Sequence, residues 1–225
     1  MNELVRAVHD ALNATAVPRR PEASLLPPTV AGVSVALPEP TPVPGTLADA
    51  VDSRRSRYAF GPGQPSLADL ASVLLRGVLA APRAGGLPSV VPFLVVRGEG
   101  EVTPGVHRVE LHDGCPRLVG VRHGDPTSYL AAALDQPPFA TRVPVWVALG
   151  LDVGATRHRY PPRHYRTLHL DAGIALQNAL LVATALGLST CPVMGYDDEA
   201  VGALLDLDHD VLVAGLVALG PARVG

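Results

Sequence analysis

The feature that most constrains this chain is a long apolar stretch, residues 171–188. Only three polar residues interrupt it after its first position, namely Gln177, Asn178 and Thr184. A helix that is apolar on every side has no face for water, so it lies either in the middle of a core or between two subunits. Asp171 suits the first turn of such a helix, where a carboxylate meets free N–H groups. We therefore expect a helix that begins at Asp171 and ends at Gly187.

One flank of this expected helix carries small side chains, at Ala172, Gly173, Ala175 and Ala179. Such a flank lets another helix approach closely. After Gly187 the chain passes through a Ser-Thr-Cys-Pro loop into a turn at residues 192–195. The N–H groups of this turn could face a ligand, or the turn could simply join two helices, and composition alone favours the connection.

Length and composition exclude several classes of protein. The 225 residues suffice for one large domain, or for a domain with an extension. Two cysteines, Cys115 and Cys191, fit a reduced cytoplasmic protein better than a secreted disulfide framework. A net charge of −3 with dispersed arginines argues against nucleic acid as a partner. The apolar runs are shorter than the roughly 20 residues that span a membrane. The first residues of the chain are amphipathic, unlike the apolar core of a signal peptide.

The chain divides into an N-terminal part, residues 1–45, and a main domain, residues 46–225. The N-terminal part starts with a short amphipathic helix. Prolines then crowd residues 16–45, so that this segment is extended and is neither a helix nor a central strand. In the main domain we expect helices at 46–56, 66–81, 128–134 and from 197, and strands at 93–98, 106–111, 117–121, 144–151 and 211–219. This order lacks regular βαβ alternation, which indicates an α+β fold with a largely antiparallel sheet.

A cluster of guanidiniums and hydroxyls in SRRSRY, at residues 53–58, has the chemistry that binds a phosphate monoester. Composition alone favours a solvated helix end at this place. The Gly85-Gly86 pair could let the backbone approach a planar ligand, although a plain turn is more common. The eight histidines lack metal-binding spacings, and neither a nucleophile elbow nor a phosphate-binding glycine loop is present. We therefore expect no metal.

Taken in order, several motifs resemble the FMN-dependent nitroreductase superfamily. They are LPEP ahead of SRRSRYAF, then PRAGGLP, PGVHRVE, RYPPRHYR, AGIALQNALLVATALGL and PVMGYDD. Within the superfamily they are similar to SagB-type dehydrogenases, which oxidise azolines to azoles in modified peptides. The resemblance implies a mainly antiparallel sheet flanked by helices in an intertwined homodimer, with FMN held by both subunits and the long helix packed across the twofold axis.

The resemblance also assigns cofactor-binding residues. It places Arg54, Arg55 and Ser56 on the FMN phosphate and ribityl chain, with Arg223 as a further phosphate partner. It places the backbone of Met194 and Gly195 against the flavin ring, near its N5. The PRAGGLP match adds Gly85 to this set.

The sequence departs from the family pattern at the residues expected to act on the substrate. Azoline oxidases carry a Lys-Tyr pair, and the nearest match here is Arg159-Tyr160, in a chain without lysine. Arginine stays protonated, so Tyr160 or Tyr165 would carry the proton transfer with an arginine lowering its pKa, or the substrate differs. Tyr58 replaces an arginine or lysine of the family, and Arg83 replaces a serine.

We therefore expect a homodimeric FMN oxidoreductase that acts on a peptide or small molecule beside other enzymes of a peptide-modifying pathway. One alternative is a scaffold subunit that has lost FMN, as Tyr58 and Arg83 suggest. Another is an NAD(P)H-dependent reductase of quinones or nitro compounds.

Overall fold

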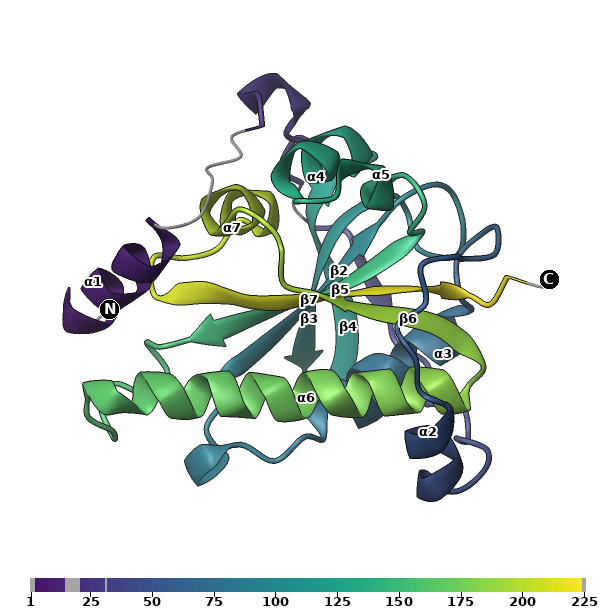
Figure 1. Cartoon of the computed structure of the whole chain (residues 1–225), viewed down its shortest axis with the longest axis horizontal. Coiled ribbons are helices and arrows are strands. Elements are labelled where there is room, and N and C mark those ends of the chain that lie inside the picture. Colours follow the sequence, from purple (N-terminus) through teal and green to yellow (C-terminus); the bar gives the residue numbers. More distant parts are fainter. Residues whose placement is uncertain (1–2, 15–20, 31, 224–225) are drawn as a thin grey trace.

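A computed structural model describes residues 3–14, 21–30 and 32–223. Within these residues seven strands form one sheet in the order β1-β4-β3-β2-β5-β7-β6 (Figure 1). All neighbouring strands run antiparallel, which confirms the expected α+β class. The strands are β1 (Ser34–Ala36), β2 (Val90–Val96), β3 (Gly105–His112), β4 (Cys115–His123), β5 (Val145–Asp152), β6 (Leu188–Val193) and β7 (Val211–Pro221).

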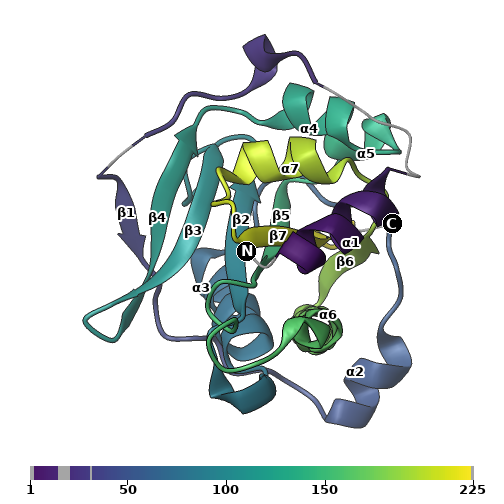
Figure 2. The ribbon, with the colours of Figure 1, turned by 90° about the vertical axis from the view of Figure 1, so that its left-hand side faces the viewer.

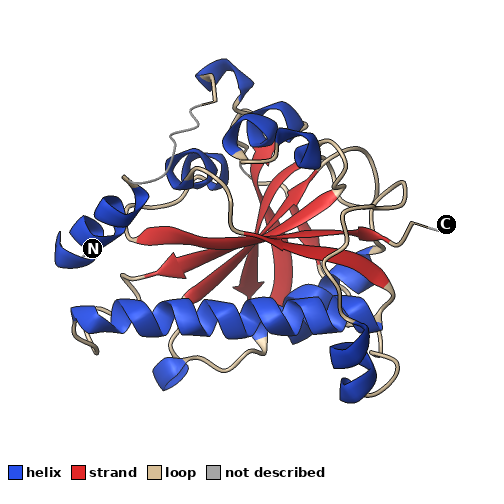
Figure 3. Cartoon of the chain, viewed as in Figure 1, coloured by secondary structure: helices blue, strands red, loops and turns tan. Residues whose placement is uncertain are grey.

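Helices cover both faces of the sheet (Figures 2 and 3). One face carries α2 (Leu47–Ser53), α3 (Leu67–Ser72) with its π-helical continuation η2 (Val73–Leu79), and the long α6 (Tyr165–Ala185). The other face carries α4 (Thr127–Ala133), α5 (Pro137–Ala140) and α7 (Asp198–Leu205). The described chain begins with α1 (Glu3–Asn13), and it also holds the short 3-10 turns η1 (Ala23–Leu25), η3 (Ala84–Gly86) and η4 (Pro162–His164).

The interior strand β5 shows how the sequence builds two cores from one sheet. Successive strand side chains point to opposite faces. Val147 and Leu149 belong to the core beneath α6, whereas Trp146 and Ala148 belong to the core beneath α4 and α7. These side chains are at most 1% exposed, so β5 is apolar throughout because both of its faces are covered.

Side-chain caps begin three of the helices expected from the sequence. Thr46 and Asp49 form a reciprocal capping box at the start of α2. The Ser66 hydroxyl accepts the Asp69 N–H at 3.1 Å, and the Asp197 carboxylate accepts the Ala200 N–H at 2.9 Å. Each bond satisfies a free N–H group of the first helical turn, which confirms the predicted starts of α2, α3 and α7.

Two expectations around the long helix are wrong. The helix begins at Tyr165, so Asp171 lies inside it, only 4% exposed, and its carboxylate has buried partners in place of a capping role. The residues after Gly187, expected as a loop, form the edge strand β6, in which Thr190 pairs with Leu219 of β7. An edge strand tolerates Pro192, because a missing N–H there breaks no second ladder.

The long helix is two-sided. The segment Pro162–Ala185 is long and apolar enough to cross a membrane by length and composition, and 39% of its most apolar window is buried. Its inner face packs against the sheet and η2, whereas its outer face exposes Leu170 (67%) and Ile174 (42%). The thin flank expected from the sequence is confirmed, because η2 approaches α6 so closely that a Cβ on Gly77 would lie 2.7 Å from the Ala179 Cα.

Gly77→Ala tests this close approach. The added Cβ would press on the backbone of α6, so we expect the free energy of unfolding to fall by about 1–3 kcal/mol. The control is Gly202→Ala in α7, where the nearest atom to the added Cβ, in the Leu207 side chain, is 3.9 Å away. It should stabilise the protein by up to about 1 kcal/mol through helix propensity. Urea unfolding measures both variants. Equal changes in their free energies of unfolding would contradict the close packing of η2 on α6.

Candidate functional site

The predicted phosphate-binding residues lie along the ends of β6 and β7. Ser56 forms a parallel bridge with Thr190, and the Arg57 N–H donates to the Thr190 carbonyl at 2.8 Å. Further on, Phe60 bridges Ala222, the residue before Arg223. Three segments distant in sequence therefore meet at one edge of the sheet, where residues 56–60 run from Thr190 of β6 to the residue before Arg223.

The side chains at this edge have the chemistry of an anion site. Arg54 is half-buried and is the C-cap residue of α2, whereas Arg55 and Ser56 are exposed. The Arg55 guanidinium donates to the carbonyls of Asp52 and Arg54 at 2.7 and 2.8 Å. Burial raises the pKa of the neighbouring Cys191 thiol, and its hydrogen bonds with Tyr58 and Ser56 offset this only in part. The thiol is therefore neutral beside positively charged and hydroxyl groups.

The residues predicted to line a planar ligand lie at the other end of β6. From Thr190 to Met194 the strand spans about 13 Å. The Met194 side chain is 59% exposed. The Gly195 carbonyl accepts the Asp135 N–H at 3.0 Å, and a Cβ on Gly195 would lie 2.6 Å from the Asp135 carboxylate. The residues predicted to bind the phosphate and those predicted to line the ring thus lie at different places along the edge strand.

A second group of predicted residues converges around the turn η3. Gly85 has a φ of 66°, and a Cβ there would collide with the Tyr160 hydroxyl. The Arg159 guanidinium donates to the Gly85 carbonyl at 3.4 Å. The Tyr160 ring stacks on His164 with centroids 4.1 Å apart and planes 14° apart. The structure therefore brings Arg159, Tyr160 and Gly85 together, although 74 residues separate Arg159 from Gly85.

Sequence reasoning missed two residues that hold this group. The Asp171 carboxylate accepts the Ala84 N–H at 3.1 and 3.2 Å and the Ser89 hydroxyl at 3.0 Å, so it fixes η3 onto α6. His164 is 8% exposed, and its Nε2 has no hydrogen-bond partner among the described residues. The sequence signal for Asp171 is an acid beside a long apolar stretch, a pattern that also predicts a helix start.

Tyr165 lies apart from Tyr160. Its hydroxyl is 3.3 Å from Nδ1 of His9 on α1, and Nε2 of His9 is 3.0 Å from the Asn13 side-chain amide. Burial, and then the Asp198 carboxylate, raise the pKa of Tyr165. The structure therefore separates the two tyrosines predicted to transfer a proton. Tyr160 lies beside η3, whereas Tyr165 lies beneath α1.

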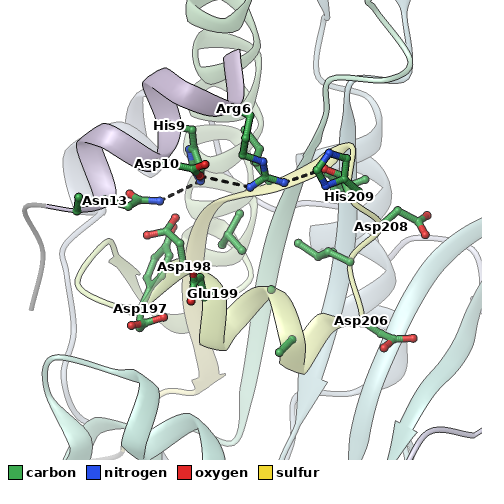
Figure 4. Close-up of a pocket in the computed structure, with 18 of the residues that line it drawn as sticks. Arg6, His9, Asp10, Asn13, Asp197, Asp198, Glu199, Asp206, Asp208 and His209 are labelled. Carbon is green, nitrogen blue, oxygen red and sulfur yellow. Dashed lines mark hydrogen bonds and ion pairs between the residues drawn. The ribbon is translucent and has the colours of Figure 1, made fainter. Parts of the chain in front are cut away.

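A cavity of about 590 Å³ lies in that second place, between α1, α7 and the start of β7 (Figure 4). Carboxylates from α1 and α7 line it, including Asp10 and Asp198, and none of the site residues predicted from the sequence does. Among residues 3–14, 21–30 and 32–223, no group of three or more His, Cys, Asp or Glu side chains is placed to hold a metal ion.

Comparison with known proteins gives a consistent result. A model of the nitroreductase family matches residues 51–220. A protein of Methanocaldococcus jannaschii that is named a nitroreductase is 26% identical over 171 residues, which are 72% of this chain and 84% of that protein.

Solved structures share the fold. A protein of Ralstonia eutropha, named a nitroreductase, gives a TM-score of 0.73 at 20% identity, covering 93% of this chain and all of that one (100%). One from Anabaena variabilis gives 0.73 at 20% identity, covering 85% of this chain, which spans only 42% of that longer one. One from Desulfovibrio desulfuricans, solved in complex with FMN, gives 0.58 at 22% identity, covering 80% of this chain and 88% of that one.

Asp171→Asn tests the link between α6 and η3. The side-chain amide has one acceptor oxygen where the carboxylate has two, so it cannot serve both donors as well, and we expect a loss of about 1–3 kcal/mol in the free energy of unfolding. Asp113→Asn, at an exposed turn with a φ of 51° that asparagine tolerates, is the matched control. Urea unfolding checks both, and equal stability of the two variants would show that the buried bonds contribute nothing.

Proposed function

Because the chain belongs to the nitroreductase family, we propose that it is an FMN-dependent oxidoreductase. The observation that carries the proposal is the arrangement along β6. Ser56, which follows Arg54 and Arg55, bridges Thr190 of β6, and Phe60 bridges Ala222, the residue before Arg223. Met194 and Gly195 follow the last residue of β6. The first group would hold the phosphate of FMN, and the second would lie against its ring. When bound, FMN supplies the acceptance and return of a hydride.

The residues present fit such a group. Guanidiniums and a hydroxyl bind a phosphate through charge-assisted hydrogen bonds, and the neighbouring thiol is neutral. Tyr58, which replaces a basic residue of the family pattern, packs against Phe139 with ring centroids 5.7 Å apart. It therefore leaves the phosphate to Arg54 and Arg55.

We further propose that the working form is a homodimer. Exposed apolar side chains lie on the outer face of α6 and on neighbouring segments, namely Leu47, Val51, Leu170, Ile174 and Met194. Large apolar side chains exposed on one helix and on the segments beside it are characteristic of a protein interface. A second copy covering α6 would keep them from water and would contribute to the FMN site, as in the family that the sequence resembles.

For the substrate we propose an azoline in a peptide, the reaction of SagB-type dehydrogenases. Such an oxidation removes a hydride and a proton from neighbouring substrate atoms. Tyr160 would take the proton as its phenolate, because its oxygen is held against Gly85 and its ring against His164. Arg159 stays protonated and would orient the substrate. The cytoplasm suits this protein, since Cys115 and Cys191 are both free thiols.

The second candidate is an NAD(P)H-dependent reductase. The observation that favours it is a fold likeness to proteins of Bacteroides thetaiotaomicron and Parabacteroides distasonis that are named NADH dehydrogenase/NAD(P)H nitroreductase. Both have a TM-score of 0.57, at 18% and 15% identity, and cover 80–81% of this chain and 89–90% of theirs.

Flavin absorbance of the purified protein, with and without added FMN, tests the proposed function. We expect the wild type to bind FMN and the double variant Arg54→Ala/Ser56→Ala to bind it at least about tenfold more weakly, because two phosphate contacts are lost. Arg117→Ala, whose guanidinium bonds Ser34 at the opposite edge of the sheet, should bind FMN as the wild type does. A colourless wild type that takes up no FMN would leave only the scaffold alternative.

In the same preparation, rapid bleaching of the flavin by NADH without oxygen would favour the reductase over a dehydrogenase.

Leu170→Asp tests the homodimer. A carboxylate on the outer face of α6 would be buried without a partner in the dimer, so we expect a monomer with reduced FMN content. Leu111→Asp is the matched control, because Leu111 on β3 is also 67% exposed but lies away from α6. Light scattering after size-exclusion chromatography measures both, and a wild-type monomer or an unaffected dimer of Leu170→Asp would contradict the proposed interface.

A further inference from the structure

A short basic segment joins β5 to the first turn of α6 (Figure 1). Residues 153–170 contain no aspartate or glutamate, but they contain four arginines, namely Arg157, Arg159, Arg163 and Arg166. The whole chain has a net charge of −3, so this segment has the opposite sign from the protein as a whole. Like charges so close together repel one another, and the carboxylates that would balance them must come from elsewhere in the fold or from a partner.

The fold neutralises one of these four arginines. Arg157 pairs with Asp210 at 3.2 Å, whereas the other three make no ion pair within the described part of the chain. The two carboxylates that bound the segment have other partners. Asp152 accepts a backbone N–H of the turn that follows it at 2.8 Å, and Asp171 is buried in its hydrogen bonds to η3 and β2. Three positive charges therefore remain unbalanced.

These three arginines are exposed, and the backbone that carries them is held in place. The Arg159 N–H donates to the Thr156 carbonyl at 3.0 Å. The His164 N–H donates to the Pro161 carbonyl at 2.9 Å. Between these two turns Pro161 and Pro162 have fixed φ angles. A partner would thus bind guanidiniums whose backbone is already ordered, which lowers the entropy cost of binding.

The basic segment passes directly beside the proposed substrate site. It contains Tyr160, whose hydroxyl lies against Gly85, and the Arg159 guanidinium donates to the Gly85 carbonyl at 3.4 Å. At its other end, Arg166 precedes the exposed Leu170 by four residues, so the two share one face of α6. The unbalanced arginines therefore extend from the proposed proton acceptor to the outer face of the long helix.

Carboxylates on an extended peptide complement this segment, because guanidiniums bind carboxylates through paired N–H donors. Three arginines do not form the long basic stripe of a nucleic-acid site, and the chain as a whole is acidic. We propose that residues 157–166 bind an acidic stretch of the peptide substrate and so place its reacting atoms beside Tyr160. That the peptide is the substrate rests on the proposed function, whereas its binding does not require FMN.

Fluorescence anisotropy of labelled, blocked peptides with the full chain tests this binding. One probe is a peptide of alternating glycine and aspartate, and the other is the same peptide with asparagine for aspartate. We expect saturable binding of the aspartate peptide and none of the asparagine peptide. The binding should disappear in about 1 M salt, where the Debye length is about 3 Å. Equal binding of the two peptides, or no binding of either, would overturn the proposal.

The double variant Arg163→Gln/Arg166→Gln locates the site. It removes two exposed guanidiniums, so the aspartate peptide should bind at least about threefold more weakly. Arg117→Gln/Arg142→Gln is the matched control with the same change in net charge. Arg117 lies on β4 and bonds Ser34 of β1, and Arg142 directly follows the α5 end on the other face of the sheet. The control should bind as the wild type does, and equal weakening in both double variants would overturn the proposed location.

Kinetics with a peptide that carries a thiazoline beside aspartates tests the role in catalysis. Arg163→Gln/Arg166→Gln should raise KM several-fold and leave kcat nearly unchanged, because the lost contacts bind the substrate and the transition state alike. A fall in kcat with an unchanged KM would contradict a role in substrate binding.

The outcomes for this segment and for the proposed function are distinguishable. A wild type that binds the aspartate peptide but takes up no FMN would contradict the proposed function alone, and the acidic-peptide surface would stand. A wild type that takes up FMN but does not prefer the aspartate peptide would overturn the surface alone. Tighter binding of phosphatidylserine vesicles or of a thymidine oligonucleotide than of the aspartate peptide, lost in Arg163→Gln/Arg166→Gln, would assign the segment to another anionic partner and would also overturn it.

Discussion

The buried carboxylate of Asp171 joins the long helix to the turn that carries Gly85. It accepts the Ala84 N–H and the Ser89 hydroxyl inside the protein, where a carboxylate without partners would cost several kcal/mol. Neither α6 nor η3 can therefore shift without the other. Since the Tyr160 hydroxyl rests against Gly85 and Arg159 donates to its carbonyl, the positions of the proposed proton acceptor and of its neighbouring arginine depend on the hydrogen bonds of Asp171.

The same helix has three roles because its faces differ. Small side chains on the inner face let η2 come close, and Ala179 lies where Gly77 has no side chain. Asp171 reaches from it to the proposed substrate site. The outer face, with Leu170 and Ile174, is apolar and exposed in a single copy. Packing in the core thus explains only the inner face of this apolar helix. The exposed apolar outer face is the reason for proposing a homodimer.

Local signals explain most of what the sequence predicted correctly. Caps such as Thr46 with Asp49, and Asp197 with the Ala200 N–H, are formed by residues close in sequence, so the helix starts follow from them. Strand β6 depends instead on pairing with β7, and its Pro192 argued against a strand. The local sequence around Asp171 predicts a helix start. Its hydrogen-bond partners, Ser89 and Ala84, lie 82 and 87 residues away, so the local sequence does not reveal them. Of the site, the residues around β6 and η3 were grouped by family resemblance, and neither His164 nor the cavity beneath α1 had a local signal.

The proposed flavin wall and the cavity beneath α1 share one short piece of backbone. Tyr196 lines the cavity and directly follows Gly195. Backbone hydrogen bonds hold this piece on both sides, from the Asp135 N–H to the Gly195 carbonyl at 3.0 Å and from the Asp197 N–H to the Ala133 carbonyl at 2.9 Å. This short piece of backbone is therefore fixed from both sides, so the position of Met194 beside it does not depend on what occupies the neighbouring cavity.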